Sequence, residues 1–576
     1  MKSTIDLKKR VKNDIRLNSN RVWTLIKERD FYYSDGRSTE SYLQEVFLKS
    51  YDLSSDSHEL ESFIKDWPSE YHLSRKRSQL LSGFNFFNAE KVLEVGCGCG
   101  SITRFLGEKF KEVIAIEGSY SRAQLARLRT KDLENIAILC APFHEINFKE
   151  RYDIIFCIGV FEYSNAFVKG SKPYDAILKL FYDALTPDGV LVLAIENQFG
   201  IKYFSSSRED HNGIRFDGIE GYPHYRDKAR TFGYYDLKNR IKKYFNEIEF
   251  YFPYPDYKLP TCILSESLLT KVHAAELIGS FRSRDYLFCD KPLFDERLSL
   301  YDIDQNGQLP FFSNSFLVIA GKQATNSIRM DSLGLFFNNN RIPEFQTVTK
   351  ILERDDGSIW TEKKCKVQAN CIKTRKLKHV PTCESWLNGY SIQSQVLRRV
   401  KMKNTSLSAL FEPCQVWISK LKDLAAREQD YFMLEGKYLD CLWRNGYNVD
   451  GECVFRDQEW EWVEKIRFNV LIIRSIFWFL DEISLMSGLT PLLRKRCTKN
   501  LITDIAKTLG IHLTKKDFKN FVCLESEISS IVFKSNPRYA KHTLNMRLWS
   551  MNAFFTVVTL KGKIRTIFEK AQRRLL

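Results

Sequence analysis

The alternation of apolar and polar residues between positions 91 and 118 predicts a strand, a tight turn, a helix and a second strand. The apolar run Val92–Val95 carries one acid, Glu94, and leads into a turn with glycine at positions 96, 98 and 100. A helical pattern follows over 101–110, and a second apolar run ends at Glu117. This order predicts the first half of a nucleotide-binding βαβ unit.

The chemistry of this turn suits a nucleotide-like ligand. Glycine lets the backbone turn tightly and approach a ligand, and the following helix offers unpaired N–H groups at its N-terminus. Glu117 lies 21 positions after Gly96, where an acid can bind both hydroxyls of a ribose. The turn reads G-x-G-x-G and lacks the last glycine of the fingerprint G-x-G-x-x-G. A NAD-binding domain is therefore an alternative and not the main prediction.

The same pattern continues beyond this unit. Apolar runs at 136–140 and 153–158 predict a third and a fourth strand, and a helix is expected over 174–185. The sequence LTPDGVLVL at 185–193 stops that helix and begins a fifth strand. An apolar run at 313–322 predicts the strand that closes the domain.

These motifs resemble those of the class I S-adenosylmethionine-dependent methyltransferases. The resemblance rests on the acid–GxGxG–acid arrangement, on D-x-(apolar run)-G-V-x-E-Y at 153–163 and on L-x-P-D-G-x-L-x-L at 185–193. It implies an α/β fold, with a Rossmann-like domain over residues 66–330 built on a mostly parallel seven-stranded sheet. It also implies S-adenosylmethionine as the cofactor. The residues that it implies as cofactor contacts are Glu94, Gly96, Cys97, Gly98, Gly100, Glu117, Gly118, Pro142, Phe143 and Gly159.

A long polar and aromatic stretch, 196–266, has little helical or strand period and predicts functional loops. Its sequences ENQFG, EDH, GIEGYP, RTF and PYPDYK resemble methyltransferases encoded with bacterial surface-polysaccharide (O-antigen) genes. This resemblance implies a saccharide, sugar-phosphate or lipid-linked glycan acceptor. Carboxylates bind hydroxyls and basic groups bind phosphate. The candidate acceptor-binding residues are His72, Arg77, Asn197, Lys202, Tyr203, Glu209, Asp210, Arg230, Tyr257 and Lys258.

His211 and Glu162 are the candidate catalytic residues. Imidazole titrates near neutral pH, so His211 can accept the proton of an acceptor hydroxyl. Glu162 and His144 are rivals for this role. A phosphate acceptor is already anionic and needs no base, and in that case Lys202 and Arg230 would matter more.

The second half of the chain carries a different set of polar residues. Asp440 and Asn445 are five positions apart, and a predicted hairpin at 447–455 separates Asn445 from Asp457. This arrangement resembles small-molecule kinases of the aminoglycoside and choline type. The resemblance implies an α+β kinase-like domain over 338–490, in which Asp440 orients an acceptor hydroxyl. It also implies ATP as a second cofactor, with Asn445 and Asp457 as ligands of Mg²⁺.

Several departures weaken the kinase interpretation. Tyr438-Leu439 and Leu442 stand where such kinases have His-Gly and His, and no glycine-rich loop precedes the strands. The lysine that would anchor ATP could be Lys363 or Lys364. An inactive module that serves as a scaffold or glycan reader is therefore an open alternative.

The two ends of the chain are polar or basic. Residues 1–65 are expected to form a leading helical segment, and residues 491–576 a helical, basic C-terminal region. The last part of that region, 552–576, mixes an apolar face with Lys and Arg. Such a helix suits an anionic membrane surface or a protein partner. A helix that caps the second domain is the other interpretation.

The length of 576 residues predicts two or three domains. No apolar run reaches the length of a membrane span, the N-terminus has no apolar signal region, and the 14 cysteines show no framework spacing. These features predict a cytoplasmic protein with reduced thiols, which could contact the inner face of the membrane through its C-terminal helix.

The net charge of +16 makes an anionic partner plausible. Because the charge is spread along the chain, nucleic acid is the least favoured partner. The main prediction is an O-methyltransferase that acts on a saccharide or sugar phosphate. One alternative is a bifunctional kinase and methyltransferase that caps a growing glycan. Another is a scaffold that recruits glycosyltransferases through its C-terminal half, and a nucleic-acid methyltransferase comes third.

Overall fold

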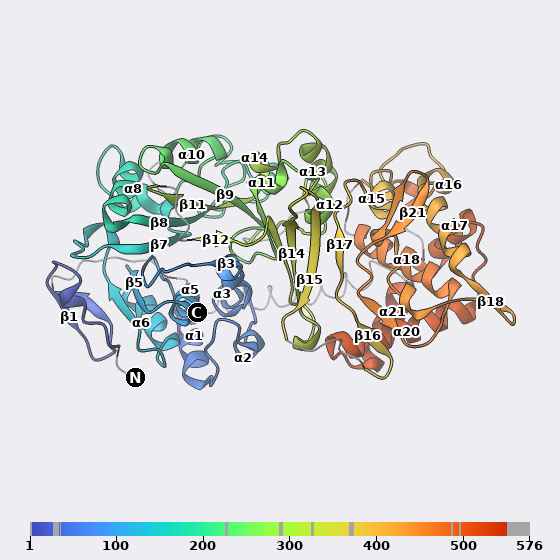
Figure 1. Ribbon diagram of the computed structural model, residues 1–576, viewed down its shortest axis with the longest axis horizontal. Coiled ribbons are helices and arrows are strands. Elements are labelled where there is room, and N and C mark those ends of the chain that lie inside the picture. The colour runs from blue at the N-terminus through green and yellow to red at the C-terminus, as the bar shows by residue number, and fades with distance from the viewer. Residues whose placement is uncertain are drawn as a thin grey trace, which may run out of the picture. The chain divides into compact units, whose positions relative to one another are not determined.

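A computed structural model gives the arrangement of the chain (Figure 1). The chain divides into two compact units, Met1–Phe336 and Phe337–Leu576, and each is described by itself. The structure describes residues 3–26, 34, 36–224, 228–286, 292–323, 328–367, 374–484, 486, 488–494 and 497–549.

A mixed sheet forms the centre of the first unit. Seven of its strands run in the order β6-β5-β4-β7-β8-β11-β9, in which β6 to β8 are parallel and β11 is antiparallel to both of its neighbours. Strands buried on both faces read as continuous apolar runs, as β4 and β7 do. These strands are β4 (Lys91–Val95), β5 (Glu112–Glu117), β6 (Ile136–Cys140), β7 (Tyr152–Ile158), β8 (Leu185–Glu196), β9 (Glu247–Tyr254) and β11 (Ser315–Gly321).

The sheet extends beyond these seven strands at both sides. On one side β1 (Ile15–Leu17) pairs with β2 (Trp23–Leu25), and β2 runs parallel to β6. On the other side β10 (Cys262–Ser265) pairs with β9 and with β13 (Gly334–Asn338). The expected seven-stranded sheet is thus the centre of a larger one.

The prediction of a helical segment over 1–65 is wrong for its first part. A short 3₁₀ helix (Leu7–Lys9) is followed by the edge strands β1 and β2, and among the described residues the first α-helices are α1 (Arg37–Lys49) and α2 (His58–Ser62). Each edge strand has three residues, which is too short to show a strand period in the sequence. The strand β2 is held by burial of Trp23 and by its register against β6.

Helices cover both faces of the sheet: α5 and α6 lie on one side and α8 and α10 on the other (Figure 1). A Cβ on Gly100, which has φ +85°, would lie 2.8 Å from the Cα of Ala126 in α6, so this glycine permits close packing of the two helices. The larger helices of this unit are α3 (Trp67–Leu73), α4 (Lys76–Ser82), α5 (Ser101–Lys109), α6 (Tyr120–Arg129), α8 (Pro173–Ala184), α10 (Tyr234–Lys242) and α13 (Glu296–Gln305). The shorter elements are α7 (Ser164–Phe167), α9 (Ile201–Phe204), α11 (Glu266–Leu269), α12 (Ala275–Ile278), α14 (Leu309–Phe312), β3 (Phe84–Asn85) and β12 (Arg329–Met330).

The second unit combines short antiparallel strands with helices. Strands β14 (Thr347–Glu353), β15 (Ile359–Cys365) and β17 (Cys383–Ser385) pair in that order. The predicted hairpin is confirmed as β20 (Gly446–Val449) and β21 (Glu452–Phe455), whose turn residues Asp450 and Gly451 both have positive φ. The other strands are β16 (Leu377–His379), β18 (Ala426–Glu428), β19 (Tyr431–Leu434), β22 (Trp460–Trp462) and β23 (Ile466–Arg467). The helices are α15 (Ile392–Leu397), α16 (Leu407–Leu410), α17 (Cys414–Leu424), α18 (Phe468–Ile483), α19 (Thr498–Thr508), α20 (Lys515–Phe533) and α21 (Pro537–Trp549).

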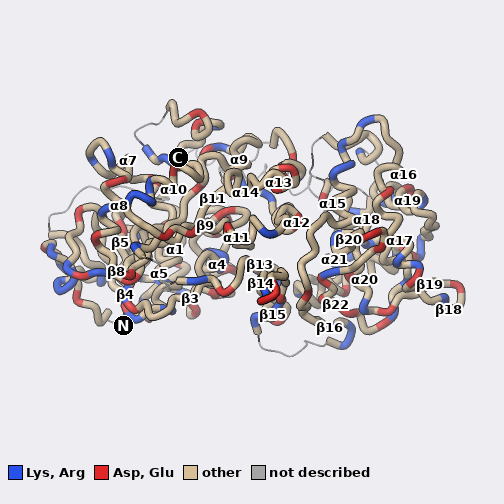
Figure 2. Tube along the Cα trace, turned by 45° about the horizontal axis from the view of Figure 1, so that its top comes forward, with Lys and Arg blue, Asp and Glu red and all other residues tan. Residues whose placement is uncertain are grey.

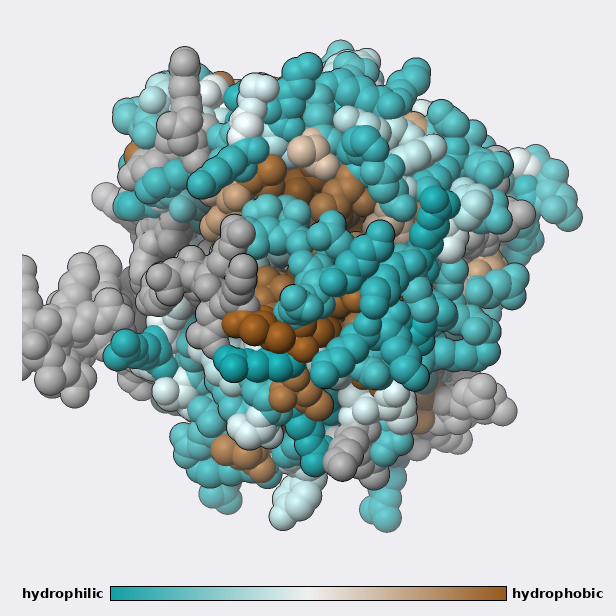
Figure 3. Space-filling model, turned by 90° about the vertical axis from the view of Figure 1, so that its left-hand side faces the viewer, coloured by the Kyte–Doolittle hydropathy of each residue, from teal (hydrophilic) through white to brown (hydrophobic). Residues whose placement is uncertain are grey.

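The described part of the C-terminal region is helical through Trp549, and the segment 552–576 expected at a membrane or a partner lies outside the described residues. None of the described helices is both long and apolar enough to cross a bilayer. Basic and acidic residues are interspersed along the chain (Figure 2). One face of the molecule is largely hydrophilic, with apolar residues gathered in a hollow near its centre (Figure 3).

Candidate active site

A cavity of about 370 Å³ lies at the carboxyl ends of the parallel strands of the first unit. Gly96, Gly118 and Gly159 line it directly after β4, β5 and β7, and Glu196 lines it at the end of β8. Ligands of open α/β sheets bind at this edge, because the loops that follow neighbouring parallel strands meet there.

The glycine turn forms one wall of this cavity. Gly96 and Gly98 have φ angles of +75° and +55°, which L-residues with a Cβ rarely adopt. A Cβ on Gly96 would lie 2.2 Å from a methyl carbon of Val160. Glycine is therefore required for both backbone conformation and space, and the turn leaves the main chain open to a ligand.

Glu117 fixes the turn from the end of β5. One carboxylate oxygen accepts a hydrogen bond from the Gly98 N–H at 2.8 Å, and the other accepts one from the Ser119 N–H at 3.0 Å. The side chain is 5% exposed and lines the cavity. These bonds hold an acid where the sequence predicts a contact to ribose.

Two buried atoms of opposite charge face the same end of the cavity. Among the described residues, neither Glu94 Oε2 nor Arg77 Nε has a hydrogen-bond partner. Burial raises the pKa of Glu94 to about 7, although the Arg77 guanidinium acts in the opposite direction. The Arg77 group also lies 4.3 Å from the centre of the Tyr71 ring and donates from Nη1 to the Lys258 carbonyl at 2.8 Å. A zwitterionic ligand would supply partners for both atoms.

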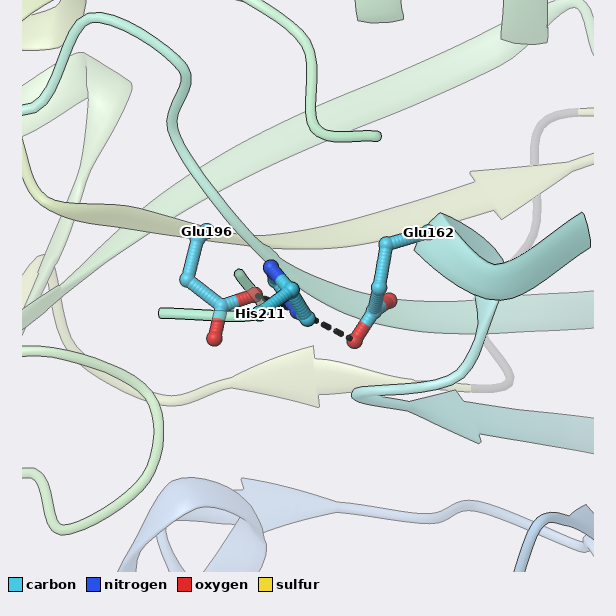
Figure 4. A group of neighbouring side chains, drawn as sticks. All are labelled: Glu162, Glu196 and His211. Carbon is cyan, nitrogen blue, oxygen red and sulfur yellow. Dashed lines mark ion pairs between the residues drawn. The ribbon is translucent and has the colours of Figure 1, made fainter. Parts of the chain in front are cut away.

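His211 lies at the other end of the cavity, and Glu209 sets its orientation. The ring Nδ1 lies 2.8 Å from Glu209 Oε1, while Glu209 Oε2 accepts the backbone N–H groups of His211 at 2.7 Å and Asn212 at 2.9 Å. With Nδ1 engaged, Nε2 points toward Glu162 Oε1 at 3.6 Å and Glu196 Oε2 at 3.8 Å (Figure 4).

Burial and neighbouring charges shift the pKa values of His211, Glu162 and Glu196. Burial would lower the pKa of His211, but the carboxylates of Glu196 and Glu209 raise it well above its usual value. Burial raises the pKa of Glu162. Burial acts in the same direction on Glu196, yet the Lys258 ammonium holds the pKa of that carboxyl below its usual value.

Two lysines and Asp210 support this group. Lys258 Nζ lies 2.6 Å from Glu196 Oε1 and also pairs with Asp210. Lys202 is fully buried, and its Nζ lies 3.0 and 3.1 Å from the two oxygens of Asp210. Lys258 thus faces the cavity and bridges two carboxylates, whereas Lys202 holds Asp210 from behind.

The structure brings most of the predicted residues to one cavity. The predicted catalytic residues Glu162 and His211 line it, as do the rival His144 and every predicted cofactor residue except Gly100, which packs α5 on α6. The predicted acceptor residues that line it are His72, Arg77, Asp210, Tyr257 and Lys258.

The other predicted acceptor residues do not line the cavity, and for these the expected direct contact is corrected. Asn197 donates to the carbonyls of Phe311 and Ser313 and so ties two loops together. Lys202 and Glu209 support Asp210 and His211 instead. Tyr203 is buried, and the Arg230 backbone N–H donates to the Glu162 carbonyl at 2.9 Å.

The sequence interpretation missed Glu196 and the aromatic residues Tyr163 and Tyr286, which line the cavity. Glu196 is the last residue of β8. Its position was the available signal, because an acid at the carboxyl end of a parallel strand lies at the ligand edge of the sheet. Tyr163 ends the motif at 153–163, which was its available signal, whereas nothing in the local pattern marked Tyr286.

The kinase-like residues of the second unit are engaged in internal contacts. Asp440 lies 3.2 Å from the Arg474 guanidinium, which also pairs with Glu525. Asn445 Nδ2 donates to the Asp440 carbonyl at 3.0 Å. Asp457 pairs with Lys363, so Lys363 faces inward, whereas the Lys364 side chain is 64% exposed.

A family model matches part of the first unit. Residues 93–191 match the family model described as "Methyltransferase domain". The chain contains a class I S-adenosylmethionine-dependent methyltransferase domain. The chain is 28% identical over 113 residues to malonyl-[acyl-carrier protein] O-methyltransferase of Priestia megaterium. The aligned segment is 19% of this chain and 38% of that protein. The chain thus spans well under half of this relative.

Other similar proteins differ in the atom that they methylate. The Bacillus anthracis malonyl-[acyl-carrier protein] O-methyltransferase is 22% identical over 222 residues, 38% of this chain and 75% of that one. The (S)-coclaurine N-methyltransferase of Thalictrum flavum is 27% identical over 120 residues, 20% of this chain and 30% of that one. The solved N-methyltransferase NodS of Bradyrhizobium japonicum, a complex with S-adenosylhomocysteine, shares 16% identity over 36% of this chain and 85% of its own, with a TM-score of 0.22. That score is too low to carry an argument.

The methyltransferase-domain residues fit the cofactor of this family. S-Adenosylmethionine carries an α-ammonium and an α-carboxylate, which match the unpartnered atoms of Glu94 and Arg77 in charge. Its ribose hydroxyls suit the Glu117 carboxylate, which holds the Gly98 N–H in the turn that lines the cavity.

Proposed function

We propose that the first unit transfers a methyl group from S-adenosylmethionine to an oxygen atom of a saccharide or sugar phosphate. One observation carries this proposal: a single cavity is lined by the glycine turn at one end and by Glu162, Glu196, His211 and Lys258 at the other. The second group of side chains is polar, charged and buried, as recognition of a hydroxyl-rich or phosphorylated acceptor requires.

The cofactor half of the cavity would hold the ligand through named groups. Glu117 would accept hydrogen bonds from the ribose hydroxyls, and Glu94 and Arg77 would bind the amino-acid part. Pro142 and Phe143 would border the adenine. When bound, the cofactor supplies a methyl carbon that the adjacent sulfonium makes electrophilic.

The acceptor half would orient an oxygen atom and exclude water. The Lys258 ammonium lies at the cavity wall and can bind a phosphate, while Tyr257 and Tyr71 offer ring faces to a sugar. A hydroxyl acceptor has to lose a proton, and His211 and Glu162 line the cavity where that proton would be taken up. Holding the acceptor in line would supply much of the rate enhancement.

The second unit acts, in this proposal, as a binding module and not as a kinase. The Asp440 carboxylate, which would have to orient a hydroxyl in a kinase, is bound by Arg474. A module of this kind could recruit a glycosyltransferase or hold a lipid-linked glycan near the first unit.

Product analysis with the purified full chain tests the proposal. The protein is supplied with S-adenosylmethionine and with sugar phosphates, oligosaccharides or lipid-linked glycans, and products are examined by mass spectrometry for an added methyl ether. At a limiting concentration of S-adenosylmethionine, Glu117→Gln should strongly reduce transfer, whereas the exposed Glu134→Gln on the same unit should not. The proposal is overturned if S-adenosylhomocysteine fails to bind, or if methyl transfer occurs only to nitrogen.

A further inference from the structure

Glu162, Glu196 and His211 come from three separate segments of the first unit and meet at one point of the cavity. Glu162 lies in the 3₁₀ turn Phe161–Tyr163, Glu196 ends β8, and His211 lies in the loop after α9. One ligand atom from each lies within 4.8 Å of the other two (Figure 4). All three side chains are almost completely buried.

These separations match those between ligands of one metal ion. Oxygen and nitrogen ligands lie about 2.0–2.2 Å from a first-row divalent ion, so two ligand atoms on one ion are at most about 4.4 Å apart. His211 Nε2 lies 3.6 Å from Glu162 Oε1 and 3.8 Å from Glu196 Oε2. An ion between the three would need only small side-chain movements.

Each of two ligands is held by a second group. The Nδ1 contact with Glu209 directs Nε2 of His211 toward the two carboxylates, and Lys258 holds the other oxygen of Glu196. Carboxylate–histidine pairs of this kind orient metal-binding imidazoles and fix their tautomer. Glu209 is itself anchored by two backbone N–H groups.

A separate observation also points to a missing ligand. In the described part of the chain, Glu162 Oε2 and Glu196 Oε2 are buried and lack a hydrogen-bond partner. A buried carboxylate oxygen without a partner costs free energy. An imidazole that binds a metal is neutral. In that state the cation would take the place of the positive charge that protonated His211 supplies, among the carboxylates of Glu162, Glu196, Glu209 and Asp210 and the ammonium groups of Lys202 and Lys258.

We propose that Glu162, Glu196 and His211 hold a divalent metal ion whose remaining positions face the acceptor. Two carboxylates and one imidazole suit an ion between the oxygen-preferring and the nitrogen-preferring classes, and Mn²⁺ is the best fit. This inference rests on the proposed function, which it deepens by making acceptor binding metal-dependent.

The ion has a defined part in the reaction. It binds the acceptor hydroxyl oxygen and lowers the pKa of that hydroxyl. The O–H bond breaks, and its proton goes to a water molecule held at one of the ion's remaining positions. The oxygen then forms a bond to the methyl carbon, and the carbon–sulfur bond breaks with its electron pair on sulfur. With the ion bound, His211 and Glu162 act as its ligands, and this role replaces the proton uptake that they would perform without it.

Metal titration of the chelator-treated full chain tests the site. Calorimetry and the electron paramagnetic resonance signal of free Mn²⁺ should show one ion bound per chain. Glu196→Gln and His211→Asn should each weaken binding at least tenfold, and Glu209→Gln, which changes a residue that contacts His211 and not the ion, should weaken it less. Glu162→Gln, on a third segment, serves if one variant does not fold, and Glu134→Gln is the matched control.

Each outcome has a distinct meaning. Substoichiometric Mn²⁺, or affinity unchanged in two of the three ligand variants, overturns the metal site. Zn²⁺ is expected to bind such a site more tightly than Mn²⁺, so tighter binding of Mg²⁺, or methyl transfer that Zn²⁺ restores and Mn²⁺ does not, overturns the choice of Mn²⁺. Binding of S-adenosylhomocysteine to the wild-type protein is measured in parallel, with and without metal. If the protein binds S-adenosylhomocysteine but no metal, only this inference fails. If the protein does not bind S-adenosylhomocysteine, the proposed function is overturned.

Discussion

Each unit buries a group of charges, and the two groups differ in how completely they are paired. In the second unit Glu459 accepts from Arg341 at 3.0 Å, lies 3.0 Å from His379 Nε2 and pairs with Lys363 at 3.2 Å. In the first unit Glu162 and Glu196 each keep one buried oxygen without a hydrogen bond, and both line a cavity. The paired group resembles a structural network, whereas the incomplete group has the properties of a ligand site.

The same contrast separates the predicted site residues of the first unit from those of the second. Glu117 and His211 face the cavity of the first unit with their functional atoms in place. Asp440 is as deeply buried but is bound by Arg474. A motif in the sequence therefore marks a site only where the fold leaves the functional atoms free to meet a ligand.

Removing Arg474 should have the largest effect. Arg474→Met leaves the carboxylates of Asp440 and Glu525 buried without their cation, and breaking a buried ion pair in this way costs about 3–5 kcal/mol. Hydrogen exchange followed by mass spectrometry should show α18 and α20 losing protection. The exposed Arg427→Met is the control. Unchanged protection would mean that this network contributes little, and that Asp440 is free to serve in catalysis.

Glu94 should make the ligand-free first unit less stable as the pH rises. Its folded pKa of about 7 exceeds the ordinary value of 4.5, so the proton is held more tightly in the folded state. The stabilisation is present in full below about pH 4.5 and is lost as the pH rises to about 7, a loss of about 3 kcal/mol. Glu94→Gln cannot ionise and should lack this loss. Urea unfolding of both proteins at about pH 5 and about pH 8 gives the free energy of unfolding at each pH. The prediction is contradicted if this free energy changes equally with pH in the two proteins.

Glu117 should affect ligand binding more than folding. Hydrogen bonds to a charged group contribute about 1.5–3 kcal/mol, so Glu117→Gln should weaken binding of S-adenosylhomocysteine roughly 10- to 150-fold. Titration calorimetry measures this change, with Glu134→Gln as control. Equal affinity in both variants would move the ribose contact away from β5 and would weaken the distinction between the two units.

The cofactor half of the site was predictable because its residues lie close together in the sequence. The turn at 96–100 and Glu117 are parts of one βαβ unit, whose spacing alone places them at the same edge of the sheet. The apolar runs at 136–140, 153–158, 185–193 and 313–322 likewise predicted the positions of β6, β7, β8 and β11. The edge strands β1 and β2 escaped prediction because they are too short to show a period and depend on pairing with β6.

The acceptor half was only partly predictable. Glu162, Glu196 and His211 come from three segments, and their meeting depends on the fold of the loop after α9. The sequence does not distinguish Lys258, which faces the cavity, from Lys202, which supports Asp210 behind it. Nor does it reveal which buried oxygens lack partners, and that is the property on which the metal inference depends.

Asp457 should have the smallest effect on stability and thereby gives the sharpest test of the second unit. Its side chain is 52% exposed, and its partner Lys363 keeps a second contact with Glu459 at 3.2 Å. Exposed ion pairs contribute about 0–1 kcal/mol, so Asp457→Asn should change the free energy of unfolding by less than about 1 kcal/mol. Methyl transfer should also stay unchanged. Titration of the wild-type protein with ATP and Mg²⁺ should give no heat of binding, because the two predicted Mg²⁺ ligands have other partners: Asp457 pairs with Lys363, and Asn445 donates to the Asp440 carbonyl. Binding that Asp457→Asn abolishes would instead make the second unit a nucleotide site.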